Sequence, residues 1–307
     1  MAGGGGGGTL ITTATVRRFP VTPVDYPQGI TVGPDGNIWF TGWYGNNIGR
    51  LTLSGTVTSF PIQTANCMPT DIVAGSDGNL WFTEQAADKI GRLTPQGKMT
   101  EFVLPTAGAL VTYLTAGPDG NVWFTETLAN KVGRITPTGA ITEFPVPSPN
   151  SHPGIITAGP GGDLWFAEIN NEALARITTD GVITEFPLPA TSSPFAVAVG
   201  GDGNVWFTGN NGQPRIGRFT LTGVTTWFPL PTQEGAPIGM TTGPDGNLWF
   251  TEATADQIGR ITSAGVITEF TLASNVTTNP VEIVTGPDGN LWFTESVSNT
   301  IARLTPR

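Results

Sequence analysis

The chain has little of the chemistry on which most enzyme sites depend. Its 307 residues include a single cysteine, Cys67, and a single histidine, His152. One cysteine excludes an intrachain disulfide and also a zinc site built from paired cysteines. One histidine leaves a single side chain of the type usually chosen as general base near neutral pH.

Charge and long apolar runs are also scarce. Charged residues make up 12% of the sequence, and the formal net charge is −10, which repels phosphate backbones and argues against nucleic acid as a partner. No run approaches the roughly 18 apolar residues that span a bilayer. The start, Met1-Ala2 followed by glycines at 3–8, lacks the basic and apolar regions of a signal peptide. We expect a soluble monomer of undetermined compartment, secreted or cell-surface if the glycine run continues a longer upstream region.

Glycine and proline are abundant, at 42 and 26 residues. Such a composition favours many turns and few long helices, which is typical of an all-β protein. The glycine run costs too much backbone entropy to order, so we expect residues 1–8 to form a disordered tail or linker. Residues 9–307 are then expected to form one domain.

A repeat organises that domain. The pair Trp-Phe recurs with spacings of 42, 42, 42, 41, 43 and 43 residues, at Trp39, Trp81, Trp123, Trp165, Trp206, Trp249 and Trp292. A period near 42 is the length of one propeller blade. Within the unit at 69–105, turn residues separate four predicted strands, at 71–74, 79–84, 90–94 and 99–104.

The second strand of each unit is apolar on both faces. In Asn79-Leu-Trp-Phe-Thr-Glu84, alternation sends Leu80 and Phe82 to one face and Trp81 to the other. A sheet of this kind must be covered on both sides, as blades are by their neighbours.

The two ends of the chain complete one unit. The last unit has predicted strands at 282–285, 291–295 and 301–305 and lacks a fourth, while residues 14–20 match the fourth-strand pattern of 141–145. Pairing the ends removes an exposed edge. The sequence therefore predicts a seven-bladed β-propeller with four-stranded antiparallel blades, in which the N-terminal strand completes the last blade.

The repeated text resembles one known family. GPDGNLWFTE at 243–252, NKVGRIT at 130–136 and ITEFPLP at 183–189 are similar to the repeats of virginiamycin B lyases, and the resemblance covers residues 14–307. Those enzymes inactivate streptogramin B antibiotics by opening the depsipeptide ring through elimination. The resemblance implies a magnesium ion and a histidine base at one mouth of the central channel.

The resemblance also implies where the functional residues should lie. Family members resemble Pro-His at the sixth junction, where this chain has Pro237-Ile238, and Glu-Pro-His at the seventh, where it has Asn279-Pro280-Val281. A further family glutamate falls at Glu295 or Ser296. By this comparison the chain lacks both catalytic histidines, and isoleucine and valine cannot act as a base.

The channel mouth is where we expect a site. Junctions between fourth and first strands converge there, and loops after the second strands lie on the same face. Junction residues differ from blade to blade, which indicates either ligand specificity or drift. The predicted ligand-binding residues are Tyr26, Gln28, Thr70, Asp71, Thr112, Tyr113, His152, Phe195, Asn279 and Glu282. Candidate catalytic residues are His152, Tyr113 and Glu282, and candidate metal ligands are Asp71, Glu282 and Glu295.

A partial ring of carboxylates ends the second strands, at Glu84, Glu126, Glu168, Glu252 and Glu295, with Gly42 and Gly209 in the other two blades. These groups could bind a cation. We expect instead that each pairs with a nearby basic group, such as a third-strand arginine (Arg92, Arg134, Arg176, Arg260 or Arg303), because the glutamate repeats with the fold. Arg50 and Arg218 persist where the glutamate is missing, which suggests that the arginines bind backbone carbonyls.

Three classes of function follow. The first is a module that binds a small molecule, peptide or glycan at the channel mouth, and the missing base favours it. The second is a carbon-oxygen lyase of the streptogramin type, or a hydrolase, with a rearranged site and Mg²⁺ implied by resemblance alone. The third is a structural module displayed by a larger glycine-rich protein. A propeller fold does not choose among them.

Overall fold

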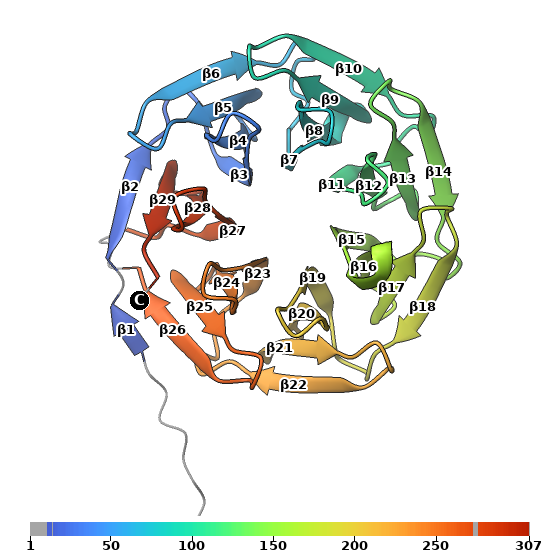
Figure 1. The fold of residues 1–307 in the computed structure, drawn as a ribbon, viewed down its shortest axis with the longest axis vertical. Helices are drawn as coiled ribbons and strands as arrows, with labels where there is room; N and C mark the ends of the chain where they lie inside the picture. The colour runs from blue at the N-terminus through green and yellow to red at the C-terminus, as the bar shows by residue number, and fades with distance from the viewer. Residues whose placement is uncertain (1–10, 14, 273–275, 307) are drawn as a thin grey trace, which may run out of the picture.

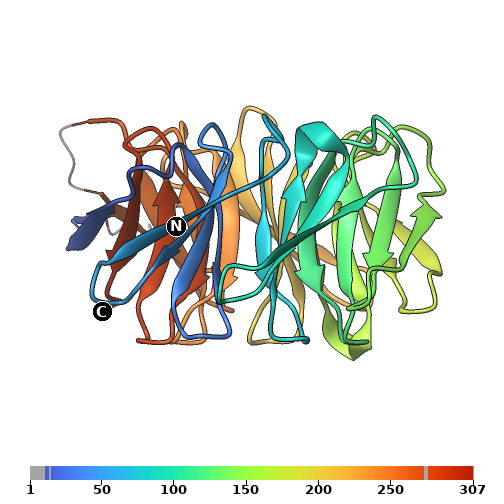
Figure 2. The same ribbon diagram turned by 90° about the horizontal axis from the view of Figure 1, so that it is seen from above.

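The computed structural model describes residues 11–13, 15–272 and 276–306. Seven sheets, each built on four antiparallel strands, stand around a central axis, as predicted (Figure 1). Seen from the side, the strands run through the thickness of a disc (Figure 2). The expected tail at residues 1–8 lies outside the described residues.

Each blade contributes one strand to each of four concentric positions. The innermost strands are β3 (Pro27–Val32), β7 (Ile72–Ala74), β11 (Val111–Ala116), β15 (Pro153–Ala158), β19 (Pro194–Val199), β23 (Pro237–Thr242) and β27 (Pro280–Thr285). The second strands are β4 (Ile38–Gly42), β8 (Leu80–Glu84), β12 (Val122–Glu126), β16 (Leu164–Glu168), β20 (Val205–Asn210), β24 (Leu248–Glu252) and β28 (Leu291–Glu295).

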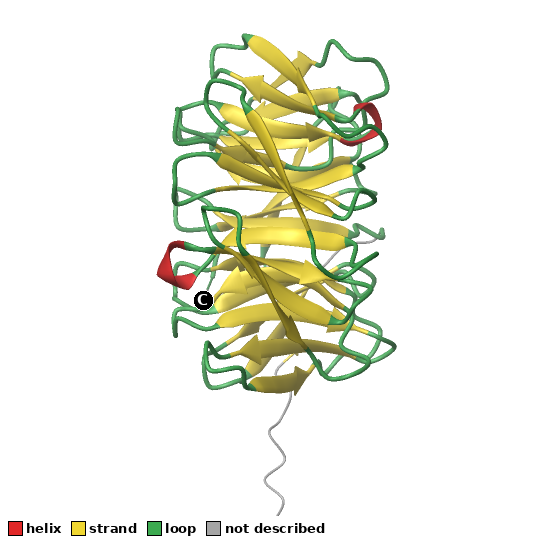
Figure 3. Cartoon of the chain, turned by 90° about the vertical axis from the view of Figure 1, so that its right-hand side faces the viewer, coloured by secondary structure: helices red, strands yellow, loops and turns green. Residues whose placement is uncertain are grey.

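The third strands are β5 (Asn47–Leu51), β9 (Lys89–Leu93), β13 (Lys131–Ile135), β17 (Ala173–Ile177), β21 (Pro214–Phe219), β25 (Gln257–Ile261) and β29 (Thr300–Leu304). The outer strands are β6 (Val57–Pro61), β10 (Met99–Val103), β14 (Ile141–Pro145), β18 (Ile183–Pro187), β22 (Thr225–Pro229), β26 (Ile267–Thr271) and β2 (Val16–Pro20). Two short 3-10 turns, η1 (Gln85–Ala87) and η2 (Pro160–Gly162), lie on opposite faces of the disc (Figure 3).

The hydrophobic core lies between blades. Trp81 packs on the third blade, in a cluster with Val111 and Phe124, whereas Phe82 packs on the first blade with Trp39. The seven repeated tryptophans are at most 2% exposed. The alternation read from the second strand is therefore confirmed, and each blade is covered on both faces by its neighbours.

The Pro-Asp-Gly-Asn turns hold these tryptophans in place. In the first blade the indole N–H of Trp39 donates to Asp35 Oδ1 at 2.9 Å, and Asn37 bonds the same carboxylate. The fourth blade has Gly161 where the other blades have this aspartate, and the indole nitrogen of Trp165 is buried without a hydrogen-bond partner. One glycine thus leaves one buried donor unsatisfied.

The ring closes at the seventh blade, as predicted from the missing strand. β2 pairs antiparallel with β29, with Arg18 opposite Ala302. Arg18 Nε lies 2.8 Å from Glu295 Oε2, and Glu295 is fully buried. The two ends of the chain are therefore joined by a hydrogen-bond ladder and by a charge pair.

One strand was not expected. β1 (Ile11–Thr13) pairs parallel with β26 and adds a fifth strand to the sixth blade. The chain before β2 thus contacts the blade next to the one it completes, and the N-terminal segment joins two blades.

Arg18→Ala should lower the free energy of unfolding by about 3 kcal/mol, because it leaves the buried Glu295 carboxylate without its cation. Chemical denaturation measures the loss. Adding Glu295→Gln should restore much of it, and Arg17→Ala on the same strand serves as the control. An Arg18→Ala protein as stable as Arg17→Ala would mean that the pair does not hold the ring closed.

Gly161→Asp combined with Asp163→Asn gives the turn the sequence Gly-Pro-Asp-Gly-Asn of the first blade. Gly161 has a φ of 80°, which strains an L residue, so the turn must also change to the conformation of the first blade, where Asp35 has no positive φ. In that conformation the Trp165 indole gains an acceptor, which should raise the free energy of unfolding by about 1 kcal/mol. Thermal and chemical unfolding measure the gain. Asp163→Asn alone is the matched control. A double variant no more stable than this control would contradict the proposed origin of the unsatisfied donor.

Candidate functional site

The junctions and the second-strand loops form one face of the ring. The residue before the innermost strand has a positive φ in five blades, at Tyr26, Leu110, His152, Ser193 and Asn279, and Met68 has one at the junction of the second blade. The carbonyls of the first five accept from the segments at or after the ends of the second strands; Trp43 N, for example, donates to Tyr26 O at 3.1 Å. In the second blade the corresponding donor, Ala86 N, bonds Cys67 O instead. This shared backbone pattern places both sets of segments at the same mouth of the channel.

A cavity of about 40 Å³ lies in the channel just below this mouth. Such a volume can hold one or two water molecules or part of a ligand. Its walls come from the first, second, third, sixth and seventh blades, through Gln28, Gly29, Thr70, Asp71, Tyr113, Ile238, Val281 and Glu282.

Two glycines let the innermost strands approach the carboxylate-bearing strands of the next blade. A Cβ at Gly29 would lie 2.7 Å from the Cα of Asp71 and 3.0 Å from its Oδ1, and one at Gly239 would lie 2.5 Å from the carbonyl oxygen of Val281 and 3.0 Å from Glu282 Oε2. These distances are shorter than ordinary van der Waals contacts. A larger residue at either position would therefore push away the backbone of the next blade together with its carboxylate.

The environment makes these carboxylates hard to ionise. Asp71 Oδ2 accepts from Leu114 N at 2.9 Å and Oδ1 from Ile72 N at 2.7 Å, yet burial still raises the pKa of Asp71 to about 7. Burial, followed by the charge of Asp71, raises the pKa of Glu282 to about 8. Near neutral pH the pair can therefore exchange protons, or ionise to meet a cationic group.

Tyr113 completes the polar part of the cavity. Burial and then the charges of Glu282 and Asp71 raise the pKa of its phenol, which stays protonated and can donate a hydrogen bond. Its ring packs edge-on against Phe195, with 5.9 Å between ring centroids. Phe195 thus supports the cavity from the fifth blade without being one of its lining residues.

The other predicted site residues lie around the cavity. Tyr26 packs against Trp43 and Tyr44, with centroid distances of 5.6 and 4.9 Å. The hydroxyl of Thr112 lies 3.0 Å from that of Thr127, and Asn279 Nδ2 donates to Ser296 Oγ at 2.8 Å. His152 is half-buried at the fourth junction, with φ of 52°.

Sequence reasoning missed Gly29 and Gly239. The signal that could have found them is the second position after each junction, which reads Gly29, Asp71, Tyr113, Ile155, Ala196, Gly239 and Glu282 around the ring. Small residues there stand in the blades before the two carboxylates.

Of the second-strand glutamates, Glu295 has a basic partner, Arg18, but the ion pairs of the third-strand arginines are with turn aspartates and not with these glutamates. Arg92 Nη1 donates to Pro137 O in the next blade at 2.6 Å. Arg134 and Arg218 likewise each donate to a turn carbonyl of the blade that follows their own. The arginines therefore bind carbonyls, as their persistence in the blades without glutamate suggested. Glu295 pairs with Arg18, so it does not belong to the channel cavity.

Four of the glutamates face a second glutamate instead. Both carboxylate oxygens lack a hydrogen-bond partner in fully buried Glu84, Glu126, Glu168 and Glu252. Burial and then the charge of Glu143 on the outer strand raise the pKa of Glu126 to about 8, against a smaller opposing effect of Lys131. Glu143 itself is held by Lys131 Nζ at 2.6 Å and by the Thr106 hydroxyl at 2.7 Å.

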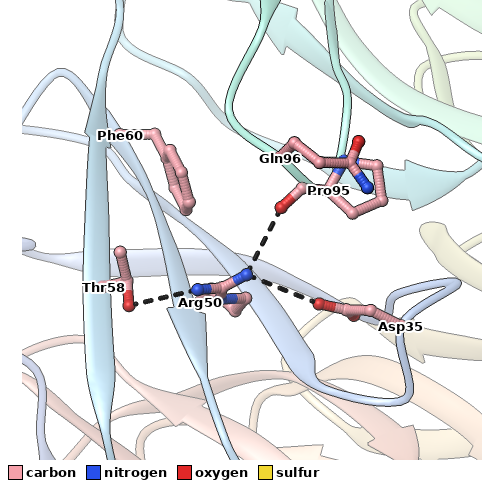
Figure 4. A pocket seen from close by; sticks show the side chains of 6 residues that line it. All are labelled: Asp35, Arg50, Thr58, Phe60, Pro95 and Gln96. Atoms are coloured by element: carbon pink, nitrogen blue, oxygen red, sulfur yellow. Dashed lines mark hydrogen bonds and ion pairs between the residues drawn. The ribbon is translucent and has the colours of Figure 1, made fainter.

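A larger cleft of about 400 Å³ lies at the rim, between the turns of the first and second blades (Figure 4). At its centre Arg50 donates to Pro95 O at 3.3 Å and lies 3.8 Å from Asp35. Because the other blades repeat this arginine contact, the cleft belongs to the structural link between blades. We therefore place the candidate site at the channel cavity.

A model of the virginiamycin B lyase family matches residues 2–213 and 190–307. The chain belongs to this family. The structure is similar to that of selenomethionine-substituted virginiamycin B lyase from Staphylococcus aureus, with 38% identity and a TM-score of 0.90, over 95% of this chain and 99% of that one.

Two further members of the family are also similar to this chain. A catalytically inactive variant of the S. aureus virginiamycin B lyase, with one histidine replaced by alanine, was solved with quinupristin; it is 37% identical, with a TM-score of 0.89, over 95% of this chain and 99% of that one. The virginiamycin B lyase of Bordetella bronchiseptica is 46% identical over 52 residues, 16% of this chain, and this match spans only 17% of that protein's length.

Two features of the described residues concern membranes and metal ions. In that part of the chain, no helix is long and apolar enough to cross a membrane. The same residues contain no group of three or more His, Cys, Asp or Glu side chains placed to hold a metal ion.

Glu126→Gln should flatten the pH dependence of stability. Folded Glu126, with its pKa near 8, holds a proton that unfolded Glu126 releases above about pH 4.5, so its contribution is full in acid and falls as the pH rises toward 8. Between pH 5 and 8.5 the variant should lose at least about 1 kcal/mol less than the wild type in chemical denaturation. Asp180→Asn, at an exposed turn, is the control, and parallel wild-type and Glu126→Gln curves would contradict the raised pKa.

Proposed function

We propose that this chain is a ligand-binding member of the virginiamycin B lyase family, which uses the channel mouth to hold a small molecule or peptide without turning it over. The observation that carries this proposal is the make-up of the cavity. Ile238 and Val281, at the junction positions where the family resemblance implies histidines, both line it. Neither side chain can accept a proton.

What remains in the cavity suits binding. Asp71 and Glu282 can meet a cationic or hydrogen-bond-donating group, Tyr113 can donate to a carbonyl, and the two aliphatic side chains offer apolar contact. Tyr26 with Trp43 and Tyr44 gives an aromatic surface beside the mouth. Polar groups that fix orientation beside apolar walls are typical of ligand sites.

The relatives indicate what kind of ligand to try first. The catalytically inactive S. aureus variant was solved with quinupristin, so loss of a histidine in that protein is compatible with a complex. We infer that a cyclic depsipeptide of this kind is a reasonable probe for the present channel. Glycans and linear peptides are further candidate ligands for the same binding site.

A second candidate function is a lyase with a rearranged site. It is favoured by the pKa values of Asp71 and Glu282, about 7 and 8, because a carboxylate with such a pKa can act as general base near neutrality. In that case Glu282 would abstract the proton, and Mg²⁺ would be bound by Asp71 together with ligand oxygens.

Quinupristin and Mg²⁺ separate the two candidates. We expect calorimetry to detect binding and mass spectrometry to detect no linearised product. Glu282→Gln and Tyr113→Ala should each weaken binding about tenfold, which corresponds to roughly 1.4 kcal/mol. Leu221→Ala, in the exposed turn between β21 and β22 at the far edge of the disc, should bind like the wild type.

The other outcomes are equally informative. A linearised product that disappears in Glu282→Gln would overturn the binding proposal in favour of the lyase. Absence of both heat and product would remove cyclic depsipeptides as ligands of the mouth. Binding that survives both cavity variants would place the ligand elsewhere on the ring.

A further inference from the structure

The blades differ in which cationic side chain lies near the buried glutamate that ends the second strand. In the seventh blade Arg18 of the outer strand reaches Glu295. In the second and third blades the outer-strand residue is a glutamate, and a lysine at the start of the third strand supplies the cation. Lys89 Nζ lies 2.9 Å from Glu101 Oε2, and Lys131 Nζ lies 2.6 Å from Glu143 Oε2.

The sixth blade keeps the two carboxylates and loses the lysine. Gln257 pairs with Glu252 in the strand register, as Lys89 pairs with Glu84 in the second blade. Glu252 and Glu269 are both 0% exposed. Two buried carboxylates therefore lie together where the chain provides an uncharged amide instead of an ammonium.

Only one of these two carboxylates is satisfied by the protein. Glu269 accepts from Thr232 N at 3.0 Å and from the Thr232 hydroxyl at 2.7 Å. Neither oxygen of Glu252 has a hydrogen-bond partner. An ionised carboxylate buried in this way is costly unless a cation or a proton neutralises it.

We propose that Glu252 and Glu269 bind a calcium ion inside the sixth blade, with oxygens of Gln257 and Thr232 as further ligands. Carboxylate, amide and hydroxyl oxygens are the donors that Ca²⁺ prefers, and its double charge balances the two carboxylates. The Thr232 hydroxyl already lies 3.2 Å from Gln257 Oε1 and 2.7 Å from Glu269 Oε2. The ion takes the place that a lysine ammonium takes in the second and third blades.

The ion would enter through a surface loop. A Cβ at Gly235 would lie 2.4 Å from Glu252 Oε2, so this loop directly covers the carboxylate, and the adjoining Gln233 and Glu234 are exposed. The site is separate from the channel cavity and does not depend on the proposed function.

The fourth blade also lacks the lysine, with Ala173 at this position. There Glu185 is only half-buried, so solvent helps to stabilise its charge. The sixth blade is therefore the stronger site, and we restrict the proposal to it.

Thermal unfolding and calorimetry with Ca²⁺ test the site in the metal-stripped full chain. We expect millimolar Ca²⁺ to raise the Tm of the wild type by several degrees, with a single equivalent bound, and with affinity that increases from pH 6 to pH 8 as the carboxyl proton is displaced. Gln257→Lys copies the second blade and should abolish the Ca²⁺ effect while raising the Tm in chelator. Glu252→Gln should abolish it as well.

Two results would overturn the proposal. A wild-type Tm unchanged by Ca²⁺ would mean that a proton neutralises Glu252. An equal Ca²⁺ shift in Gln257→Lys would place the ion elsewhere, and Asp71→Asn with Glu282→Gln identifies whether it binds in the channel. Should Glu252→Gln not fold, Gln257→Lys still decides, because the second and third blades already accommodate that lysine.

Discussion

The structure depends on one constraint, which is that every blade is apolar on both faces and must be covered by two neighbours. No blade can therefore be an end. The closing strand β2 meets this constraint twice. It pairs with β29 in the seventh blade, and it carries Phe19, which stacks on Trp292 at 5.3 Å and packs against Phe40 of the first blade. Closure is thus hydrophobic as well as hydrogen-bonded.

Because the strands carry this constraint, the ends of the blades are free to vary. The second position after each junction varies most usefully: Asp71, Tyr113 and Glu282 line one cavity, and Gly29 and Gly239 allow close approach of the next blade. Buried positions vary too: the partner of the second-strand glutamate is Arg18 in one blade and Glu143 with Lys131 in another. Comparing equivalent positions in different blades therefore shows which partner each buried glutamate has gained or lost.

The fold could be read from the sequence because the Trp-Phe period and the missing fourth strand both follow from blade geometry. The site could not be read as fully. Most innermost strands carry a bulge just after the junction, as between Pro27 and Ile30, and such a bulge decides which side chain enters the channel. The pairing of Glu126 with Glu143 depends on strand register across β13, which composition does not reveal. Arg18 stands where four of the other outer strands have glutamate, and this exchange was the readable signal.

The distance along the chain between the closing residues affects how the protein is made. Arg18 and Glu295 are 277 residues apart, so β2 leaves the ribosome long before its partner exists. At 5–20 residues per second, this interval is roughly a quarter of a minute to a minute. During translation the nascent blades expose apolar edges to chaperones and to neighbouring chains, and the ring becomes resistant to aggregation only when its last strand is released.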